Sequence, residues 1–126
     1  MKSKKKLKIC LVFGGKSGEH EVSLQSAKSV YEALDKKKYD VLLVGIDKSG
    51  RWHLGAPSNY LLNATSPKLI KLNNEAPAVT AITKTGKAKI IRLESGKELS
   101  NVDVFFPVTH GTFGEDGSLQ GFLELL

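Results

Sequence analysis

The stretch that decides the fold is Phe13-Gly14-Gly15-Lys16-Ser17-Gly18-Glu19-His20-Glu21-Val22-Ser23-Leu24. An apolar run at residues 7–13 leads into it, and apolar residues recur at helical spacing over 22–34. A buried strand that stops at two glycines and continues as a helix is typical of the start of a βαβ unit. In open α/β sheets, ligands bind outside the carboxyl ends of the strands, which is where this loop falls. The sequence therefore predicts an α/β fold with a candidate binding loop after its first strand.

This loop lacks the spacing of the two familiar phosphate-binding motifs. If residues 15–17 ended a P-loop, its first glycine would fall at Cys10, inside the strand. The dinucleotide fingerprint also fails, because Lys16 stands where its second glycine is required. Two acids and a histidine at residues 19–21 instead mark the start of the helix, where unpaired N–H groups collect. Two interpretations stay open: a ligand-binding loop without its own phosphate cradle, and a tight turn with solvated charges.

The composition is that of one ordinary globular domain. The chain has 126 residues, of which 40% are hydrophobic and 25% are charged. No stretch reaches transmembrane length, and the short apolar run after the lysine-rich start has no signal-peptide cleavage site. The single cysteine, Cys10, falls inside a predicted buried strand, which favours a reducing compartment without a disulfide. We therefore expect a cytoplasmic protein.

The net charge of +6 is unevenly distributed, and its pattern argues against nucleic-acid binding. Lysines cluster at the N-terminus and again at residues 36–38, just after the predicted helix. No aromatic residues interleave with these lysines, and only Arg51 and Arg92 are arginines. Solvated lysines beside a strand and at a helix end, where they suit the helix dipole, are the favoured interpretation.

A second strand is predicted over residues 39–46, because a continuous apolar run is typical of the interior of a parallel sheet. Gly45 within it suggests close packing or a bend. Residues 47–50 form a turn signal, and 51–54 predict a short returning edge strand. His53 on that strand is expected to be exposed.

The middle of the chain changes character. A single helical turn is expected within residues 59–64. Residues 65–101 are polar, and within them 78–83 and 88–93 predict the two strands of a hairpin. We interpret residues 65–101 as an insertion or an ornament at the edge of the main sheet, without a set of chemically active residues.

A third interior strand is predicted over residues 102–108, and Pro107 is expected to mark its end. Apolar residues at helical spacing predict a helix over 119–126. The carboxyl ends of neighbouring parallel strands meet at one edge of the sheet. The loop between this third strand and the final helix should therefore share one crevice with the first loop, with His110 opposite Glu21. That loop is Thr109-His110-Gly111-Thr112-Phe113-Gly114-Glu115-Asp116-Gly117-Ser118.

The last residue, Leu126, falls inside this apolar pattern, without a C-cap glycine or a closing lysine. We therefore expect residues 1–126 to be one domain of a longer protein. An apolar helix face without the strand that should follow it also predicts marginal stability or self-association.

Together these loops resemble the N-terminal domain of the D-alanine–D-alanine ligases, of the long type with an insertion before the third core strand. Residues 12–27 and 106–121 carry the resemblance, segments 47–52 and 58–64 fit it, and it is weakest over 66–100. It implies a Rossmann-like, pre-ATP-grasp, mostly parallel sheet with flanking helices and an inserted β-hairpin. The ATP-grasp domains of such ligases are absent from this sequence.

The resemblance also implies an activity for the whole protein. These ligases phosphorylate one D-alanine with ATP, and the amine of a second D-alanine attacks the acylphosphate, which gives a dipeptide for peptidoglycan. Glu21 matches the acid that holds the first D-alanine's ammonium, and His110 matches the histidine of the same subsite, so both are predicted catalytic residues. Ser23 and Gly111 are predicted to join them in binding substrate.

Other parts of the family's machinery fall outside this sequence. ATP and Mg²⁺ (or Mn²⁺) are expected to bind in regions that are absent here, so the isolated chain should be inactive and should not bind ATP. The family also implies a homodimer through this domain. The alternative is a non-catalytic dimerisation or Rossmann-like domain of another ATP-grasp enzyme.

Overall fold

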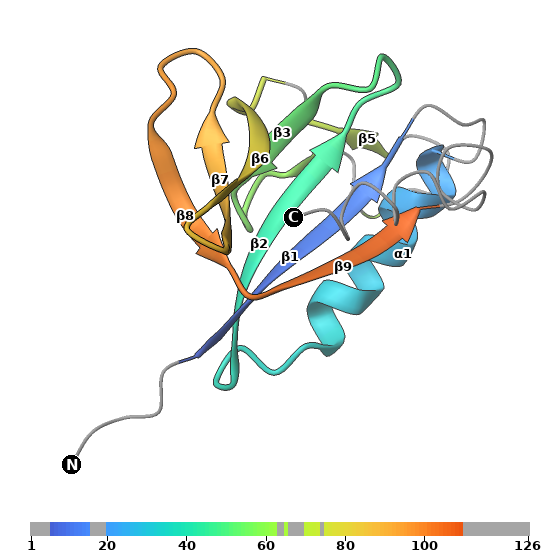
Figure 1. Cartoon of the computed structure of the whole chain (residues 1–126). Helices are drawn as coiled ribbons and strands as arrows, with labels where there is room; N and C mark the ends of the chain where they lie inside the picture. Colours follow the sequence, from blue (N-terminus) through green and yellow to red (C-terminus); the bar gives the residue numbers. More distant parts are fainter. Residues whose placement is uncertain (1–5, 16–19, 63–64, 66–69, 74, 110–126) are drawn as a thin grey trace.

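The computed structural model describes residues 6–15, 20–62, 65, 70–73 and 75–109 (Figure 1). A seven-stranded sheet has the order β8-β7-β6-β3-β2-β1-β9, and β4 and β5 form a separate pair. The elements are β1 (Leu7–Gly14), α1 (His20–Ala33), β2 (Tyr39–Ile46), β3 (Trp52–Gly55), β4 (Leu61–Leu62), β5 (Lys71–Leu72), β6 (Ala78–Lys84), β7 (Lys87–Arg92), β8 (Glu98–Val102) and β9 (Val104–Thr109).

Three parallel strands form the centre of the fold. β1 pairs in parallel with β2 on one side and with β9 on the other. Gly14, at the end of β1, is in register with Ile46 of β2 and Thr109 of β9. The two predicted loops therefore leave neighbouring parallel strands at the same end of the sheet, as the sequence indicated.

The remaining four pairings, from β2 through β3, β6 and β7 to β8, are antiparallel. The α/β class and the parallel core are confirmed, and the sheet as a whole is mixed. The prediction of an edge strand at 51–54 is wrong, because β3 lies between β2 and β6. The helical turn predicted at 59–64 is also wrong, because Leu61 and Leu62 pair with β5 as strand β4.

The sheet curls back on itself. β8 and β9 stand at opposite ends of the strand order, yet only Asp103 separates them in the sequence. The amide of Asp103 donates to the carbonyl of Lys8 at 2.9 Å, and the amide of Lys8 donates to Asp103 Oδ2 at 2.8 Å. The end of β8 therefore meets the beginning of β1, where β9 starts (Figure 1).

Successive side chains of the central strands point to opposite faces of the sheet, so both faces need cover. α1 packs against β1 and β9 and covers one face. The buried cluster beneath it contains Leu11, Phe13, Leu24, Ala27, Leu43, Tyr60, Ile70 and Leu72. The curled sheet encloses the other cluster, which contains Cys10, Val12, Val44, Ile46, Val79, Ala81, Ala88, Ile90 and Val102.

The predicted hairpin is confirmed as β6 and β7, toward the β8 end of the strand order, but it is more than an ornament. It supplies Val79, Ala81, Ala88 and Ile90 to the second core, because the antiparallel strands fold over that face. Cys10 is fully buried there, and burial raises the pKa of its thiol to about 12.

Two single-residue predictions have different outcomes. Gly45 marks close packing, as expected, since a Cβ there would lie 2.2 Å from Cδ1 of Leu72. Pro107 does not end its strand, because β9 continues to Thr109. Among the described strands β9 is the outermost on its side of the sheet, a position that tolerates proline.

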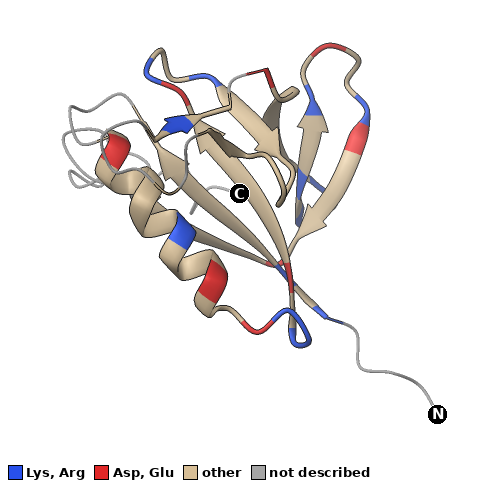
Figure 2. Ribbon diagram, turned by 180° about the vertical axis from the view of Figure 1, so that it is seen from behind, with Lys and Arg blue, Asp and Glu red and all other residues tan. Residues whose placement is uncertain are grey.

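The helix predicted over 119–126 lies outside the described residues. None of the helices in the described part of the chain has the length and hydrophobicity that crossing a bilayer requires. Seen from behind, both acidic and basic segments occur along α1 and the loop after it (Figure 2).

Candidate functional site

The candidate site begins with a sharp turn at the carboxyl end of β1. Gly14 and Gly15 have φ values of +86° and +112°, in the region that favours glycine. A Cβ on Gly14 would lie 2.3 Å from the carbonyl oxygen of Ile46, so only glycine fits. The amide of Gly15 donates to that same carbonyl at 2.8 Å, which ties the turn to the end of β2.

Ser23 connects α1 to the ends of strands β1 and β9. Its side chain is fully buried in α1. Its Oγ accepts a hydrogen bond from the amide of Gly14 at 2.8 Å and donates one to the carbonyl of Val108. The hydroxyl therefore fixes α1 against both strands that lead into the loops, and its predicted contact with substrate stays a prediction.

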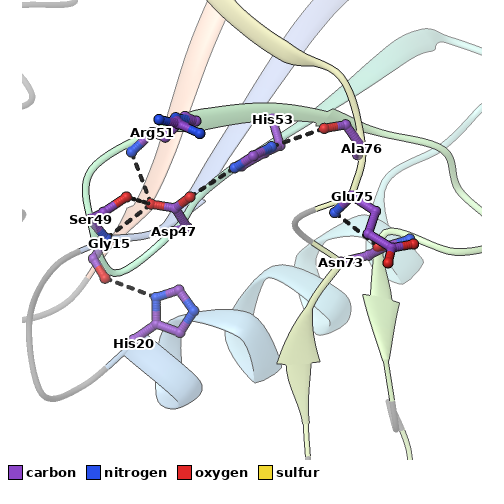
Figure 3. Close-up of polar contacts among 9 residues, drawn as sticks. All are labelled: Gly15, His20, Asp47, Ser49, Arg51, His53, Asn73, Glu75 and Ala76. Atoms are coloured by element: carbon purple, nitrogen blue, oxygen red, sulfur yellow. Dashed lines mark hydrogen bonds and ion pairs between the residues drawn. The ribbon is translucent and has the colours of Figure 1, made fainter.

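His20 closes the first loop. Its side chain is 5% exposed, and its Nδ1 lies 2.8 Å from the carbonyl oxygen of Gly15 (Figure 3). A carbonyl oxygen only accepts, so Nδ1 carries the proton and donates. The histidine of the predicted charged trio is thus a buried side chain that donates to the backbone just after β1, and it is not a solvated group.

Glu21 is the functional candidate that the structure describes most fully. It lies in the first turn of α1, where a carboxylate interacts favourably with the helix dipole, and its side chain is 39% exposed. Its Oε1 lies 2.9 Å from Nζ of Lys48. The hydrogen bond from Lys48 and one from its own backbone amide hold the pKa of Glu21 below its usual value. Glu21 is therefore an ionised, accessible carboxylate that already binds an ammonium group.

The turn that carries Lys48 is held by the carboxylate of Asp47. Its Oδ1 accepts hydrogen bonds from the amides of Ser49 at 2.9 Å and Arg51 at 3.0 Å (Figure 3). Burial raises the pKa of Asp47, but hydrogen bonds from Ser49, His53 and Arg51 outweigh it, and the pKa lies well below its usual value.

His53 anchors this turn to the insertion. Its Nε2 lies 2.8 Å from Oδ2 of Asp47, and its Nδ1 lies 2.9 Å from the carbonyl oxygen of Ala76 (Figure 3). The side chain is 5% exposed, so the prediction of an exposed hairpin histidine is wrong. The cause is the position of β3 inside the sheet, with β6 and its approach packed beside it.

The remaining predicted site residues, His110 and Gly111, lie outside the described residues. The structure describes the strand that leads to them as far as Thr109, next to Gly14. The proximity of His110 to Glu21 stays a prediction.

Sequence reasoning missed Lys48 as a neighbour of the site. The signal available was the turn 47–50 at the carboxyl end of the second parallel strand, beside the first loop.

The fold and the site define a Rossmann-like α/β domain that presents an anionic side chain at the carboxyl ends of parallel strands. Residues 8–126 match the family model described as D-ala D-ala ligase N-terminus. The chain belongs to this family.

Curated proteins similar to this chain are named as D-alanine–D-alanine ligases. The D-alanine–D-alanine ligase of Oceanobacillus iheyensis is 53% identical over 120 residues, and D-alanine–D-alanine ligase A of Escherichia coli K12 is 52% identical. Each match covers 95% of this chain but 33% of the relative, so the chain spans about a third of their length.

Solved structures agree with this relationship. The D-alanine–D-alanine ligase of Coxiella burnetii has a TM-score of 0.76 and 39% identity, over 96% of this chain and 33% of that one. The VanG D-Ala:D-Ser ligase of Enterococcus faecalis has a TM-score of 0.74 and 35% identity, over 96% of this chain and 34% of that one.

Proposed function

We propose that this chain is the part of a D-alanine–D-alanine ligase that binds the first D-alanine, with Glu21 as the ligand of its ammonium group. The observation that carries the proposal is the state of Glu21. Its carboxylate is ionised, 39% exposed, and already pairs with an ammonium nitrogen at 2.9 Å. An amino-acid substrate offers the same chemical group, and charge-assisted hydrogen bonds are the stronger ones.

The names of the relatives support assigning D-alanine to this domain. The Coxiella burnetii protein is named for D-alanine twice, whereas the Enterococcus faecalis protein is named for D-alanine and D-serine. Both share this fold with the chain. Because the two proteins share both this domain and D-alanine, we assign the first D-alanine to the domain. The second substrate, which differs between them, is assigned elsewhere.

Around Glu21 we propose a division of roles. His110 and Gly111, from the loop after β9, complete the subsite, and His110 donates a hydrogen bond as the first D-alanine is activated. Ser23 acts by holding both loops at their strand ends, because its hydroxyl bonds the backbone of Gly14 and Val108. The whole cytoplasmic enzyme then joins two D-alanines for peptidoglycan, with ATP converted to ADP and phosphate.

ATP and Mg²⁺ are assigned to the part of the relatives that this chain does not span. The glycine loop after β1 lacks the spacing of a phosphate cradle. Among the described residues, no three His, Cys, Asp or Glu side chains gather as a metal ion requires. No step of our proposal for this domain therefore runs through either group.

The test is the Glu21→Gln variant of the full-length ligase, which keeps the shape of the side chain and removes its charge. We expect kcat/KM for the first D-alanine to fall roughly ten- to hundredfold, because a hydrogen bond to a charged group contributes about 1.5–3 kcal/mol. Glu32→Gln, at an exposed position of the same helix, is the matched control. Unchanged kinetics in Glu21→Gln, or an equal loss in both variants, would refute the proposal.

His110→Ala tests the second loop. We expect it to lower kcat more than it raises KM if its hydrogen bond forms mainly as the substrate is activated. Melting temperatures measured alongside separate this from simple unfolding. The alternative, a non-catalytic dimerisation domain, predicts that both variants leave kcat/KM intact.

A further inference from the structure

We propose that Lys48 is a built-in competitor for the ammonium position on Glu21, which the first D-alanine must displace. This inference rests on the proposed function, because it takes Glu21 as the ligand of the substrate ammonium. The inference assigns an effect on substrate affinity to Lys48, which lies in the turn after β2 and not in the two loops that carry the family resemblance. In this role Lys48 is a positioning residue and takes no part in the chemistry.

The geometry makes the two ammonium groups rivals. Nζ of Lys48 lies 2.9 Å from Oε1 of Glu21, the distance of a direct charge-assisted hydrogen bond. A substrate ammonium that binds the same carboxylate needs the same kind of contact. Two cations on one carboxylate also repel each other at these distances.

Exposure makes the exchange easy. The side chain of Lys48 is 64% exposed and that of Glu21 is 39% exposed. Exposed ion pairs contribute little to stability, because water solvates both partners well and the long lysine side chain loses freedom on pairing. Lys48 can therefore release Glu21 to an incoming ligand at little cost.

The backbone beneath Lys48 keeps it near the site after release. Asp47 binds the amides of Ser49 and Arg51, and His53 joins Asp47 to the carbonyl of Ala76. Gly50 completes the turn with a φ of +90°. The turn is thus fixed at both ends, whereas the ammonium at the tip of the lysine side chain is free to move.

Removing Lys48 does not remove the charge that binds substrate. Lys48 lowers the pKa of Glu21, but the usual value of 4.5 already leaves this carboxylate ionised at neutral pH. A Lys48→Met variant therefore presents the same anion without its competing partner. Affinity for the first D-alanine should rise, which is the opposite of the effect expected for a substrate ligand.

The experiment measures initial rates of the full-length ligase over a range of D-alanine concentrations at pH 7.5, fitted with separate constants for the two substrate sites. We expect Lys48→Met to lower KM for the first D-alanine about two- to fivefold with kcat unchanged. Lys48→Arg keeps the cation and should behave as the wild type. Lys84→Met is the matched control, because Lys84 is 57% exposed and lies 3.1 Å from Glu98 in the inserted hairpin.

A double variant separates this inference from the proposed function. If Lys48 acts through Glu21, Lys48→Met should have no effect on KM in the Glu21→Gln background. If Glu21→Gln impairs the enzyme but Lys48→Met leaves KM unchanged or raises it, Lys48 is not a competitor while the role of Glu21 stands. If Glu21→Gln has no effect on kinetics, both proposals fail. A fall in KM that persists in the double variant also overturns the role of Lys48.

Discussion

Replacing Ser23 with alanine removes one hydroxyl that connects three elements of the fold. In the wild-type domain this oxygen accepts from the amide of Gly14, donates to the carbonyl of Val108 and is fully buried. Alanine fits the space without a clash, so the change isolates the two hydrogen bonds. Both strands that lead into the candidate site lose this hydrogen bond to α1 but keep their packing against it.

The magnitude follows from these two bonds. Each buried hydrogen bond contributes about 0.5–1.5 kcal/mol net, and an unsatisfied buried donor such as the Gly14 amide costs about 1–3 kcal/mol. The better helix propensity of alanine returns a few tenths of a kcal/mol. We expect the free energy of unfolding to fall by about 2–4 kcal/mol.

The assay combines urea denaturation with amide hydrogen exchange of the full-length protein. In Ser23→Ala, peptides that contain Gly14 should exchange faster, because that amide loses its partner. Ser29→Ala is the control: the same substitution at an exposed position of α1 should be neutral or slightly stabilising. Unchanged stability and exchange together with a raised KM for D-alanine would refute this reasoning and make Ser23 a substrate ligand.

Two further predictions concern the turns around the site. Gly14→Ala should lower the free energy of unfolding by about 3 kcal/mol or more, and Gly86→Ala by only about 1 kcal/mol. Both glycines have positive φ, but only at Gly14 would the new Cβ lie 2.3 Å from a backbone oxygen. Equal losses of unfolding free energy in urea denaturation would contradict this prediction. Asp47→Asn should cost about 1.5–3 kcal/mol at pH 7, less at pH 3. The folded-state pKa of Asp47 is depressed below 3.8, so the contribution of its carboxylate to stability is present above pH 3.8 and is lost as the pH falls further. A difference in unfolding free energy that does not change with pH would contradict this prediction.

The parallel core was predictable because its signals are local. Continuous apolar runs mark β1 and β2, and helical spacing marks α1 between them. Glycines directly after a strand mark the first loop, where Gly14 is required by its φ and by the nearby backbone of β2. Similar polar, glycine-rich loops follow β1 and β9 in the sequence, and such loops gather at the carboxyl ends of neighbouring parallel strands. The two strands were therefore expected to be neighbours.

The rest depends on contacts between segments that are far apart in the sequence. The position of β3 inside the sheet, and so the burial of His53, is set by its pairing with β6, which no pattern around His53 reveals. The pair between Glu21 and Lys48 exists because β2 ends beside the start of α1. The curl that returns β8 to β1 depends on the backbone of Asp103 and Lys8. The periodicity of apolar residues predicts where helices and strands lie. The contacts between distant segments depend on which strands pair and in which register, which periodicity does not show.

The pairing of β1 with β9 has a consequence during synthesis on the ribosome. β2 can pair with β1 early, but the other side of β1 waits until residues 47–103 have been translated. At about 5–20 residues per second, this strand keeps an open edge for roughly 3–11 s. Lysines at positions 2, 4, 5 and 6 precede this strand and Lys8 lies within it, and such charges discourage pairing of an apolar strand with other nascent chains. The basic N-terminus, unexplained by any ligand, thus suits the protection of an unfinished sheet.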